Sequence, residues 1–555
     1  MSIETAATSL VDVVVLTEME RMNLSQLCVS SAKEVVPPGL LPLCNRPLIW
    51  YSLHPWVEAG FPYVFVCAVE GNHALSEYLR QAFPQLRIHY VPVPAYVKGE
   101  RSTSCDAVRA YLNYKQQLRL RDDDEPEPLT PAAGVPRDKL REERAALEAE
   151  PRDAVLVGCE TVLAGVPLLP LVDRFYSSLA SVTALLFRPL PRKEEKKAAG
   201  GKRHGPPQAA EPLPVAHSFS CTAYEEDDVI ADMTAGARAV PAAGGPLHHR
   251  LHFLERLEES DAKVGVTMAF AARRPNLTFA ADTVDMRLYV VRHWVLQLIA
   301  ETAGDPDESV EDTVIPRLVR SQHTTVNVRV HASQTPDERI GFAIPPYWMY
   351  TGHQSSVDSL NAARGTVLPP RADSLRVFAT IYEERADLPC KLYRVDSCEA
   401  YLAVTQELLE GKARLMELDA AAPRASTVGT DAPAEDEALR SRSALAASVP
   451  HNPLTLTAKE GDQRLHIVTS YVSDASELFN ANVTKSVIGP GVVLAEGATV
   501  RNSVLLANVV VGAKCKIENS VLGKGAIVKD GQTVRRSFVR GGCSVNDDVS
   551  NAVVE

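Results

Sequence analysis

Residues 485–541 read KSVIGPGVVLAEGATVRNSVLLANVVVGAKCKIENSVLGKGAIVKDGQTVRRSFVRG. Within this stretch the tripeptides KSV, NSV, NSV and RSF place Ser486, Ser503, Ser520 and Ser537 at a constant spacing of 17 residues. A fixed copy length is the sequence signature of a repeat architecture, in which each copy folds as one unit and stacks on its neighbours. The C-terminal part of the chain is therefore predicted to be a repeat domain.

Apolar residues return every five or six positions inside each copy. This spacing predicts that three short strands close one triangular coil, with one aliphatic side chain per side pointing to the axis, so that stacking the coils buries them. We expect a left-handed parallel β-helix of hexapeptide repeats over residues 461–555. An antiparallel β-sandwich is the rival fold, but its strands alternate with period two and keep no 17-residue copy length. The residues expected to point inward are Ile488, Leu494, Val500, Leu506, Val511, Ile517, Leu522, Val528, Val534 and Val539.

Glycines recur near the expected corners of the coils. A corner requires a positive φ, which costs a residue with a side chain more than it costs glycine. The residues assigned to this role are Gly489, Gly491, Gly497, Gly512, Gly523, Gly525 and Gly531. Polar residues such as Lys514, Lys516 and Lys529 are expected to face water.

The first part of the chain alternates short apolar runs with segments of helical character. The runs are VDVVVL at 11–16, YVFVCAV at 63–69, RIHYVPV at 87–93 and DAVLVG at 153–158, and RPLIWYSLHPWVEAG at 46–60 lies between the first two. Buried strands separated by amphipathic helices indicate an α/β domain with a Rossmann-like parallel sheet.

A helix is also expected around residues 286–301, MRLYVVRHWVLQLIAE. Leu288, Val291, Val295 and Leu298 in this segment would share one helical face. Such a stripe is more often part of a core than a ligand site.

Low-complexity segments separate the parts of the chain. Charged stretches rich in Pro, Ala or Gly read as surface insertions, and an Ala, Ser, Asp and Glu stretch without an apolar period reads as a linker. The expected organisation is an α/β domain at 1–330 with insertions at about 121–152 and 190–214, a connecting segment at 331–460 with a low-complexity stretch at 418–449, and the β-helix at 461–555.

The 555 residues carry a net charge of -12. This balance argues against binding to nucleic-acid phosphates, which requires a basic face. The ten cysteines are scattered without a CxxC pair, so reduced, buried thiols and no zinc site are expected. A signal peptide and a membrane-spanning segment are also not expected, which favours a cytoplasmic (cytosolic) protein.

A resemblance to a known family adds to this interpretation. An α/β domain followed by a hexapeptide β-helix resembles the sugar-nucleotide pyrophosphorylases and the related subunits of translation initiation factor 2B, and the strongest local match is VVPPGLLPLCNRPLIWYSL at 35–53. In the active enzymes this pattern holds a Pro-Lys-Pro whose lysine neutralises phosphate charge during transfer. Here Pro37, Pro38 and Gly39 stand in its place, so the lysine is missing.

Two further elements of that family are altered. The family places a glycine-rich loop after the first strand to hold phosphates, whereas this chain has Glu18 and Glu20 there and keeps only Arg21 as a relic. A metal-binding aspartate is replaced by Glu160, which could still ligate magnesium. The resemblance therefore implies a degenerate ancestral pocket at Arg21, Pro38, Gly39 and Glu160, with no catalytic, cofactor-binding or metal-binding residue, no cofactor and no enzymatic activity.

Within the family the sequence is most similar to the gamma-type subunits, which it matches in order through HRLHFLERL, TVDMRLYVVRHWVLQL, RVFATIYEE and YRVDSCEAYLAVTQELL. The epsilon subunit carries an additional catalytic helical domain, which is not expected here. The resemblance implies a non-catalytic subunit that assembles with the epsilon, alpha, beta and delta subunits and supports GDP/GTP exchange on translation initiation factor 2. The alternatives are a sugar-1-phosphate nucleotidyltransferase similar to mannose-1-phosphate guanylyltransferases, or the regulatory subunit of one.

Overall fold

The computed structural model describes most of the two expected domains. Arg21, Glu18, Glu20, Cys390, the insertions (apart from Arg152) and the stretch 418–449 lie outside the described residues. The described ranges are 11–17, 24–31, 34–44, 46–83, 86–97, 100–120, 152–189, 219–226, 247–256, 276–302, 308–322, 375–384, 391–409, 454–460, 463–473 and 475–554.

Four parallel strands form one half of the N-terminal sheet. They are β1 (Val11–Leu16), β6 (Tyr63–Val69), β7 (Arg87–Val93) and β10 (Asp153–Gly158), with the same bounds that the sequence predicts. Their order is β7-β6-β1-β10, and β1 is almost completely buried. Parallel strands buried on both faces have continuous runs of apolar residues, which explains why these four were readable in the sequence.

The other half of the sheet is largely antiparallel, so the expected parallel sheet is in fact mixed. The long strand β15 (Thr278–Val291) pairs antiparallel with β10, and it also pairs with β12 (Val182–Arg188) and β13 (Phe219–Glu226). Strands β14 (Leu247–Arg256) and β16 (Val377–Glu383) complete a closed circuit, β15-β12-β16-β14-β13-β15. Closing the circuit gives each of these strands two neighbours, which removes free sheet edges.

The prediction of a helix at 286–301 is wrong for the first half of that range. Leu288 and Val291 belong to β15, whereas Val295 and Leu298 lie on α10 (His293–Thr302). All four side chains are buried. A strand that is buried on both faces has no polar positions to reveal its period of two. The apolar pattern at the end of β15 was therefore read as the start of the helix that follows it.

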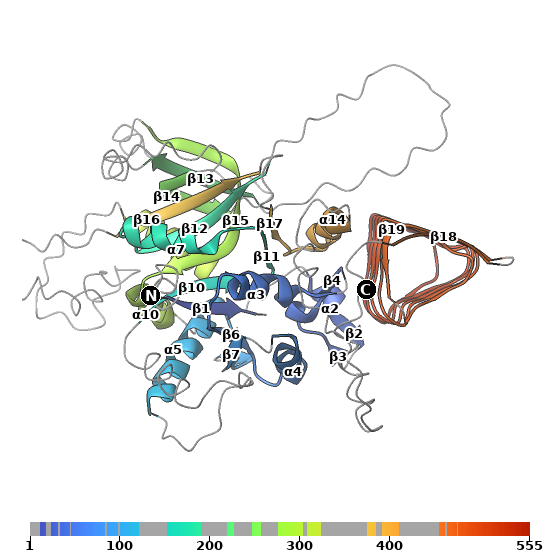
Figure 1. Cartoon of the computed structure of the whole chain (residues 1–555), viewed down its shortest axis with the longest axis horizontal. Helices are drawn as coiled ribbons and strands as arrows, with labels where there is room; N and C mark the ends of the chain where they lie inside the picture. Colours follow the sequence, from blue (N-terminus) through green and yellow to red (C-terminus); the bar gives the residue numbers. More distant parts are fainter. Residues whose placement is uncertain are drawn as a thin grey trace, which may run out of the picture.

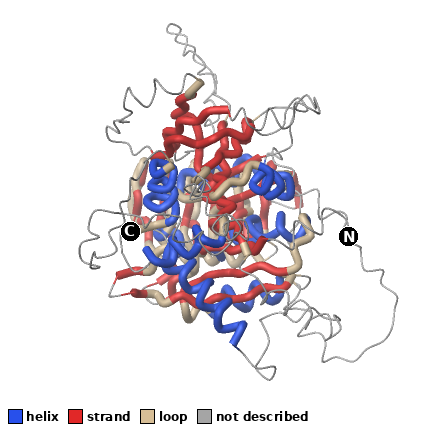
Figure 2. Tube along the Cα trace, turned by 90° about the vertical axis from the view of Figure 1, so that its left-hand side faces the viewer, coloured by secondary structure: helices blue, strands red, loops and turns tan. Residues whose placement is uncertain are grey.

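Helices cover both faces of the sheet, as Figures 1 and 2 show. Two large hydrophobic clusters, one on each face, join the helices to the strands. On one face lie α3 (Leu48–Glu58), α4 (His73–Ala82) and α7 (Leu168–Ser177), and on the other lie α5 (Ser104–Leu120), α10 and α11 (Ile315–Ser321).

Short elements complete the described part of this domain. They are α2 (Ser25–Cys28), β2 (Val29–Ser31), β3 (Glu34–Val35), the 3₁₀ turn η1 (Pro38–Leu40), β4 (Pro42–Leu43), β5 (Arg46–Pro47), β8 (Tyr96–Val97), β9 (Glu100–Arg101), β11 (Thr161–Ala164), the π-helical turn η2 (Val310–Val314), β17 (Lys391–Arg394) and α14 (Cys398–Leu409). Strands β16 and β17 and helix α14 come from the range 331–460, which the sequence assigned to a connecting segment. The α/β domain therefore extends beyond residue 330, because β16 fills a place inside the sheet.

The C-terminal domain winds into three parallel sheets that Figure 1 shows nearly end-on as a triangle. We call its sides the polar face, the docked face and the open face. The polar face has β21 (Asn482–Thr484), β24 (Thr499–Arg501), β27 (Lys516–Glu518), β30 (Thr533–Arg535) and β33 (Val549–Ser550). The docked face has β22 (Val487–Ile488), β25 (Val504–Leu505), β28 (Val521–Leu522), β31 (Phe538–Val539) and β34 (Val553–Val554). The open face has β20 (Glu477–Leu478), β23 (Val493–Leu494), β26 (Val510–Val511), β29 (Ile527–Val528) and β32 (Ser544–Val545). A hairpin of β18 (Leu454–Glu460) and β19 (Gln463–Val472) precedes the coils.

The inward positions agree with the expectation at every site except one. Leu505, and not Leu506, lies in the axial core. The inward residues around it are Val500, Leu505, Val511, Ile517 and Leu522, so each 17-residue coil has steps of six, six and five. From the sequence, the five-residue step was placed after Leu506, whereas in the structure this step runs from Val500 to Leu505. Leu506 instead contacts the hydrophobic cluster of the α/β domain.

The glycines serve two different purposes, only one of which was expected. Positive φ occurs at Gly491, Gly497, Gly525 and Gly531, as predicted. The other three are required by close stacking, because a Cβ at Gly489, Gly512 or Gly523 would lie 3.0 Å or less from backbone atoms of the next coil. The remaining corner has a positive φ without glycine, at the residue before each repeated serine: Lys485, Asn502, Asn519, Arg536 and, in the last coil, Asn551 before Ala552.

The repeated serines form a buried ladder through the coils. The Oγ of Ser503 donates to the carbonyl of Arg501 at 2.6 Å and accepts the N–H of Ser520 at 3.2 Å. Ser486, Ser520 and Ser537 repeat the pattern. Each hydroxyl thus satisfies two buried backbone groups at a corner where no strand pairing is available.

Replacing Ser503 by alanine should destabilise the β-helix by about 1–3 kcal/mol, because the buried N–H of Ser520 would lose its acceptor. Thermal unfolding of the full chain measures the effect, with Ser544→Ala on the exposed side of β32 as the control. Equal melting temperatures for the two variants would contradict a stabilising role for the ladder.

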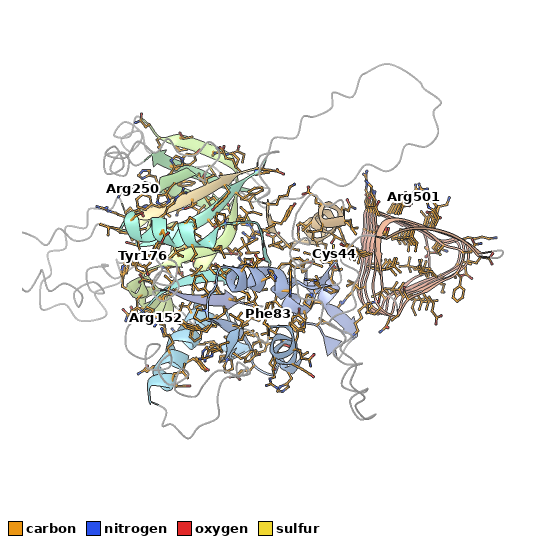
Figure 3. All side chains as sticks on the ribbon, viewed as in Figure 1. Cys44, Phe83, Arg152, Tyr176, Arg250 and Arg501 are labelled. Atoms are coloured by element: carbon orange, nitrogen blue, oxygen red, sulfur yellow. The ribbon has the colours of Figure 1, made fainter. Side chains whose placement is uncertain are left out.

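The two domains share one hydrophobic cluster. Val487, Val504, Val521 and Phe538 project from the docked face into the cluster that contains Tyr51 of α3. Helix α14 is buried almost all round and lies at this junction, where Gln406 Nε2 donates to the carbonyl of Asn502 at 3.0 Å. In Figure 3, Cys44 marks the side of the α/β domain that faces the β-helix, and Arg501 projects from the β-helix.

Candidate functional site

Glu160 occupies the tight turn between β10 and β11 and is fully buried. Its carboxylate folds back over Gly158, where a Cβ would lie 2.4 Å from Oε1 of Glu160. The chain thus reserves space at the carboxyl end of a central parallel strand for a charged group. This is the edge of an open α/β sheet at which ligands usually bind.

The partner of Glu160 is a guanidinium group. Arg287 Nη1 lies 2.5 Å from Glu160 Oε1, and Arg287 Nε contacts Glu311. Arg287 is itself buried, and burial lowers its pKa to about 9, which leaves it charged at neutral pH. Each of the two carboxylates therefore has a positive charge at short range.

Further ion pairs extend this network. Arg394 of β17 contacts Glu311 at 3.4 Å and Asp396 at 3.1 Å, and it donates to the carbonyl of Asp285 at 3.1 Å. The Asp285 carboxylate accepts a bond from the hydroxyl of Tyr289 at 2.5 Å, and burial raises the pKa of Asp285. We call Glu160, Arg287, Glu311, Arg394, Asp396, Asp285 and Tyr289 the buried ion network.

Backbone irregularities converge on the same place. Arg287 has a φ of 51°, although it is not glycine, and the register between β12 and β15 shifts beside it. Glu311 lies in a π-helical turn. Bulges, π-turns and left-handed non-glycine residues are enriched at functional sites, because they cost free energy that regular structure would avoid.

The arrangement does not fit a divalent cation. A magnesium ion needs carboxylate oxygens that are free to coordinate it, and Arg287 already contacts both Glu160 and Glu311. In the described part of the chain, no group of three His, Cys, Asp or Glu side chains is placed to hold a metal ion. The guanidinium of Arg287 supplies the positive charge that a metal ion would otherwise bring to Glu160.

The other expected site residues lie elsewhere. Pro38 and Gly39 form the turn η1, where Gly39 is buried and a Cβ on it would be 3.7 Å from Cβ of Ile49 on α3. Arg21 falls outside the described residues. Of the three parts of the expected pocket, the structure therefore describes two. Glu160 lies in the buried ion network, and Pro38 and Gly39 lie in a turn beside α3.

The sequence interpretation missed most of the buried ion network. Arg287, Glu311, Arg394 and Asp396 were not singled out, although Arg287 and Arg394 each stand inside an apolar run, MRLYVV and LYRV. A charged residue inside a buried run requires a partner. That rule could have identified both arginines, but not the carboxylates that pair with them.

A second buried cluster surrounds Asp12 on β1. Its carboxylate accepts bonds from the Tyr111 hydroxyl at 2.6 Å and from Lys115 at 2.5 Å, both on α5, and from the Tyr63 hydroxyl at 3.1 Å. The neighbouring His89 ring stacks on Phe65 with ring centroids 4.8 Å apart. These contacts fix α5 against the sheet.

Acid should destabilise the protein through His89. Burial lowers its pKa to about 4 from an ordinary value of 6.5, against the opposing effect of Asp12 and with smaller lowering effects of Arg87 and Lys115. The neutral ring contributes stability that is complete above pH 6.5 and is lost as the pH falls towards 4, by about 3 kcal/mol in total. His89→Phe should remove this part of the pH dependence in urea unfolding at pH 7.5, 6 and 5. Parallel pH profiles for the two proteins would contradict the assignment.

The described cysteines fit the expected thiols. All nine are unbridged and all except Cys543 are buried, and burial raises the pKa of the Cys44 and Cys67 thiols. Among the described residues, no helix combines the length and apolar character required to cross a membrane.

Comparisons with known proteins agree with this architecture. Residues 452–553 match the family model described as "GlmU-like, C-terminal hexapeptide". The chain is also similar to "Translation initiation factor eIF2B subunit gamma" from Schizosaccharomyces pombe, with 21% identity over 296 residues. That match covers 53% of this chain and 48% of the relative, so the chain spans about half the length of the curated relative it matches. These similarities support placing the chain among the nucleotidyltransferase-like proteins that carry a hexapeptide domain.

Proposed function

We propose that the chain is a non-catalytic gamma subunit of the guanine-nucleotide exchange factor for translation initiation factor 2. The observation that carries this proposal is the similarity to the fission-yeast gamma subunit over more than half of the chain. In this role the chain assembles with the catalytic epsilon subunit and with the alpha, beta and delta subunits in the cytosol. It supports GDP/GTP exchange by helping to bind the substrate factor, without direct contact to nucleic acid or membrane.

The buried ion network supports the non-catalytic part of the proposal. Nucleotidyl transfer requires groups that hold and neutralise phosphates and a metal ion. Here Arg287 contacts Glu160, the residue at the expected metal position, and Pro38 stands where the family has its lysine. The same scaffold then acts through its surfaces.

Pyrophosphate release tests the enzymatic alternative. The purified chain is incubated with a sugar 1-phosphate, GTP or UTP and magnesium. We expect no release above a buffer blank, and a Glu160→Gln variant, which would disable a metal site, serves as the matched control. Turnover at an enzymatic rate that Glu160→Gln abolishes would establish a sugar-1-phosphate nucleotidyltransferase.

Affinity purification tests the subunit assignment. The tagged chain expressed in its native cells should recover the other four subunits and translation initiation factor 2, identified by mass spectrometry. The eluate should accelerate GDP release from that factor. Recovery of a sugar-nucleotide transferase instead would identify the chain as the regulatory subunit of such an enzyme.

A further inference from the structure

The segment that contains β17 and α14, residues 391–409, contacts both the buried ion network and the β-helix. We call this segment the arm. Its strand pairs with β11, which directly follows Glu160, and the N–H of Val395 donates to the carbonyl of Glu160 at 3.0 Å. Backbone hydrogen bonds thus join the arm to the turn that carries one of the carboxylates of the network.

Two charged side chains of the network belong to the arm itself. Arg394 is 6% exposed and contacts Glu311 at 3.4 Å and Asp396 at 3.1 Å. Asp396 directly precedes Ser397, whose hydroxyl accepts the N–H of Ala400 at 3.2 Å and caps the start of α14. A shift of Asp396 would therefore move the first turn of α14.

The network holds more carboxyl groups than guanidinium groups, which makes each guanidinium important. Its four carboxyl and two guanidinium groups are those of Glu160, Asp285, Glu311, Asp396, Arg287 and Arg394. A third guanidinium reaches it from the surface, because Arg256 lies 3.4 Å from Asp396 and its side chain is 39% exposed. A buried carboxylate without a partner is costly, so the loss of Arg394 should force Glu311 or Asp396 to move or to take up water.

Side-chain contacts hold the strand and the helix of the arm together. The hydroxyl of Tyr393 donates to Glu407 at 2.7 Å, and the ammonium of Lys391 lies 3.6 Å from the same carboxylate. Glu407 belongs to the last turn of α14, so the end of the helix is fixed to β17 as well. From Cys398 to Gln406 the helix extends about 12 Å as one regular element. The arm can therefore transmit a movement along its length.

The last turns of α14 contact the β-helix, and Figure 1 shows this helix between β17 and the coils. The side chain of Gln406 donates to the carbonyl of Asn502 at 3.0 Å, and Gln406 is only 4% exposed. Leu402 and Leu408 of α14 belong to the same hydrophobic cluster as Val504 of the docked face. The arm thus has one end in the ion network and the other in the junction between the domains.

We propose that the arm couples the buried ion network to the docking of the β-helix. Loosening the network then loosens the junction, and loosening the junction loosens the network, because a coupling free energy between two sites acts in both directions. A change at Glu160, at the carboxyl end of β10, is in this way transmitted to the position of the β-helix. The inference goes beyond the proposed function and does not depend on it.

Two native cysteines report separately on the two ends of α14. Cys398 is its first residue, and the thiol of Cys44 donates to the carbonyl of Thr405 near its last turn at 3.8 Å. Both thiols are buried, and burial raises their pKa, so they react with iodoacetamide only when the surrounding structure opens. Cys67, against α5, and Cys515, in the axis of the β-helix, are buried elsewhere and serve as references.

The test measures the labelling rate of each of these cysteines in the full chain by mass spectrometry of its peptides. In Arg394→Gln, Cys398 and Cys44 should both be labelled at least about tenfold faster than in the wild type, because uncompensated buried carboxylates favour local opening. The labelling rates of Cys67 and Cys515 should change by less than about twofold, since opening at the junction does not involve them.

Arg292→Gln is the matched control. It removes another partly buried guanidinium, which pairs with Asp153 at 3.1 Å and is 26% exposed. Asp153 begins β10, whereas Glu160 follows its end, so this pair lies at the opposite edge of the sheet from the ion network. Labelling of Cys44 in this variant should stay at the wild-type rate.

Gln406→Ala tests the opposite direction. It removes the hydrogen bond to Asn502 at the β-helix end of the arm without changing a charge. The labelling rates of Cys44 and of Cys398 should rise together, by about threefold, because the loss of one buried hydrogen bond is shared by both ends of the coupled element. A rise at Cys44 with Cys398 unchanged would contradict the coupling.

Two further results would overturn the proposal. One is labelling of Cys44 at the wild-type rate in Arg394→Gln, which would confine any effect of this substitution to the network. The other is an equal rise at all four cysteines both in Arg394→Gln and in the milder Arg256→Gln, because the chain would then open only as a whole. Recovery of the exchange-factor subunits does not depend on these rates, so the two proposals fail independently.

Discussion

Replacing Arg287 by alanine is expected to lower the free energy of unfolding by about 3–5 kcal/mol, one of the largest effects of any single substitution in this chain. The substitution removes the positive charge between Glu160 and Glu311, both of which are buried. Two carboxylates would then lie near each other with less compensation in a low-dielectric interior. Urea unfolding at pH 7 measures the change.

Arg320→Ala is the matched control, because Arg320 also pairs with a glutamate but on the surface. Its guanidinium lies 3.3 Å from Glu255, and its side chain is 59% exposed. An exposed pair of this kind contributes at most about 1 kcal/mol. Adding Glu160→Gln to Arg287→Ala should recover part of the loss, since it removes one of the uncompensated charges. Full recovery of Arg287→Ala on adding magnesium would instead indicate that the site accepts a metal ion.

Val521→Asp is expected to disrupt the junction between the domains. Val521 projects from the docked face, is fully buried and belongs to the cluster shared with the α/β domain. A carboxylate without a partner there should cost about 4 kcal/mol or more, because neither water nor a counter-charge reaches it. Limited proteolysis and small-angle X-ray scattering should show a β-helix detached from the α/β domain, or a chain that no longer folds.

Val510→Asp provides the comparison at an equivalent outward position on the open face. Its side chain is 41% exposed, so the new carboxylate remains hydrated. At 1 μM the free energy of unfolding of this variant should lie within about 0.5 kcal/mol of the wild-type value, as is usual for surface substitutions. If both variants lost stability equally, burial by the α/β domain could not be the reason for the effect of Val521→Asp.

Local repetition made the β-helix readable from the sequence. The 17-residue copies define the coils, and nine of the ten expected inward residues point to the axis. Leu506 was misplaced because a coil has one step of five, and periodicity alone does not say which of its three steps is short. The corner role of Lys485, Asn502, Asn519 and Arg536 was missed for a related reason, since glycine is the usual signal for a positive φ.

The α/β domain was less readable, because long-range pairing decides much of it. The four parallel strands were found from their apolar runs, but the end of β15, from Met286 to Val291, was assigned to a helix and β16 to a connecting segment. Neither strand carries a local signal of its partners. Their neighbours in the sheet come from segments that lie far away in the sequence.

The amino-acid sequence by itself determined the coil length, the serine ladder positions, the parallel strands and the absence of the family's lysine at Pro38. Each of these depends on residues that are close together along the chain, where spacing and side-chain chemistry are sufficient. Only the tertiary structure decided that Glu160 contacts Arg287 and Glu311, and that one aliphatic ladder of the β-helix is buried while the other is exposed. These outcomes depend on which distant segments meet, and a charge or an apolar side chain acquires its role from the partner that covers it.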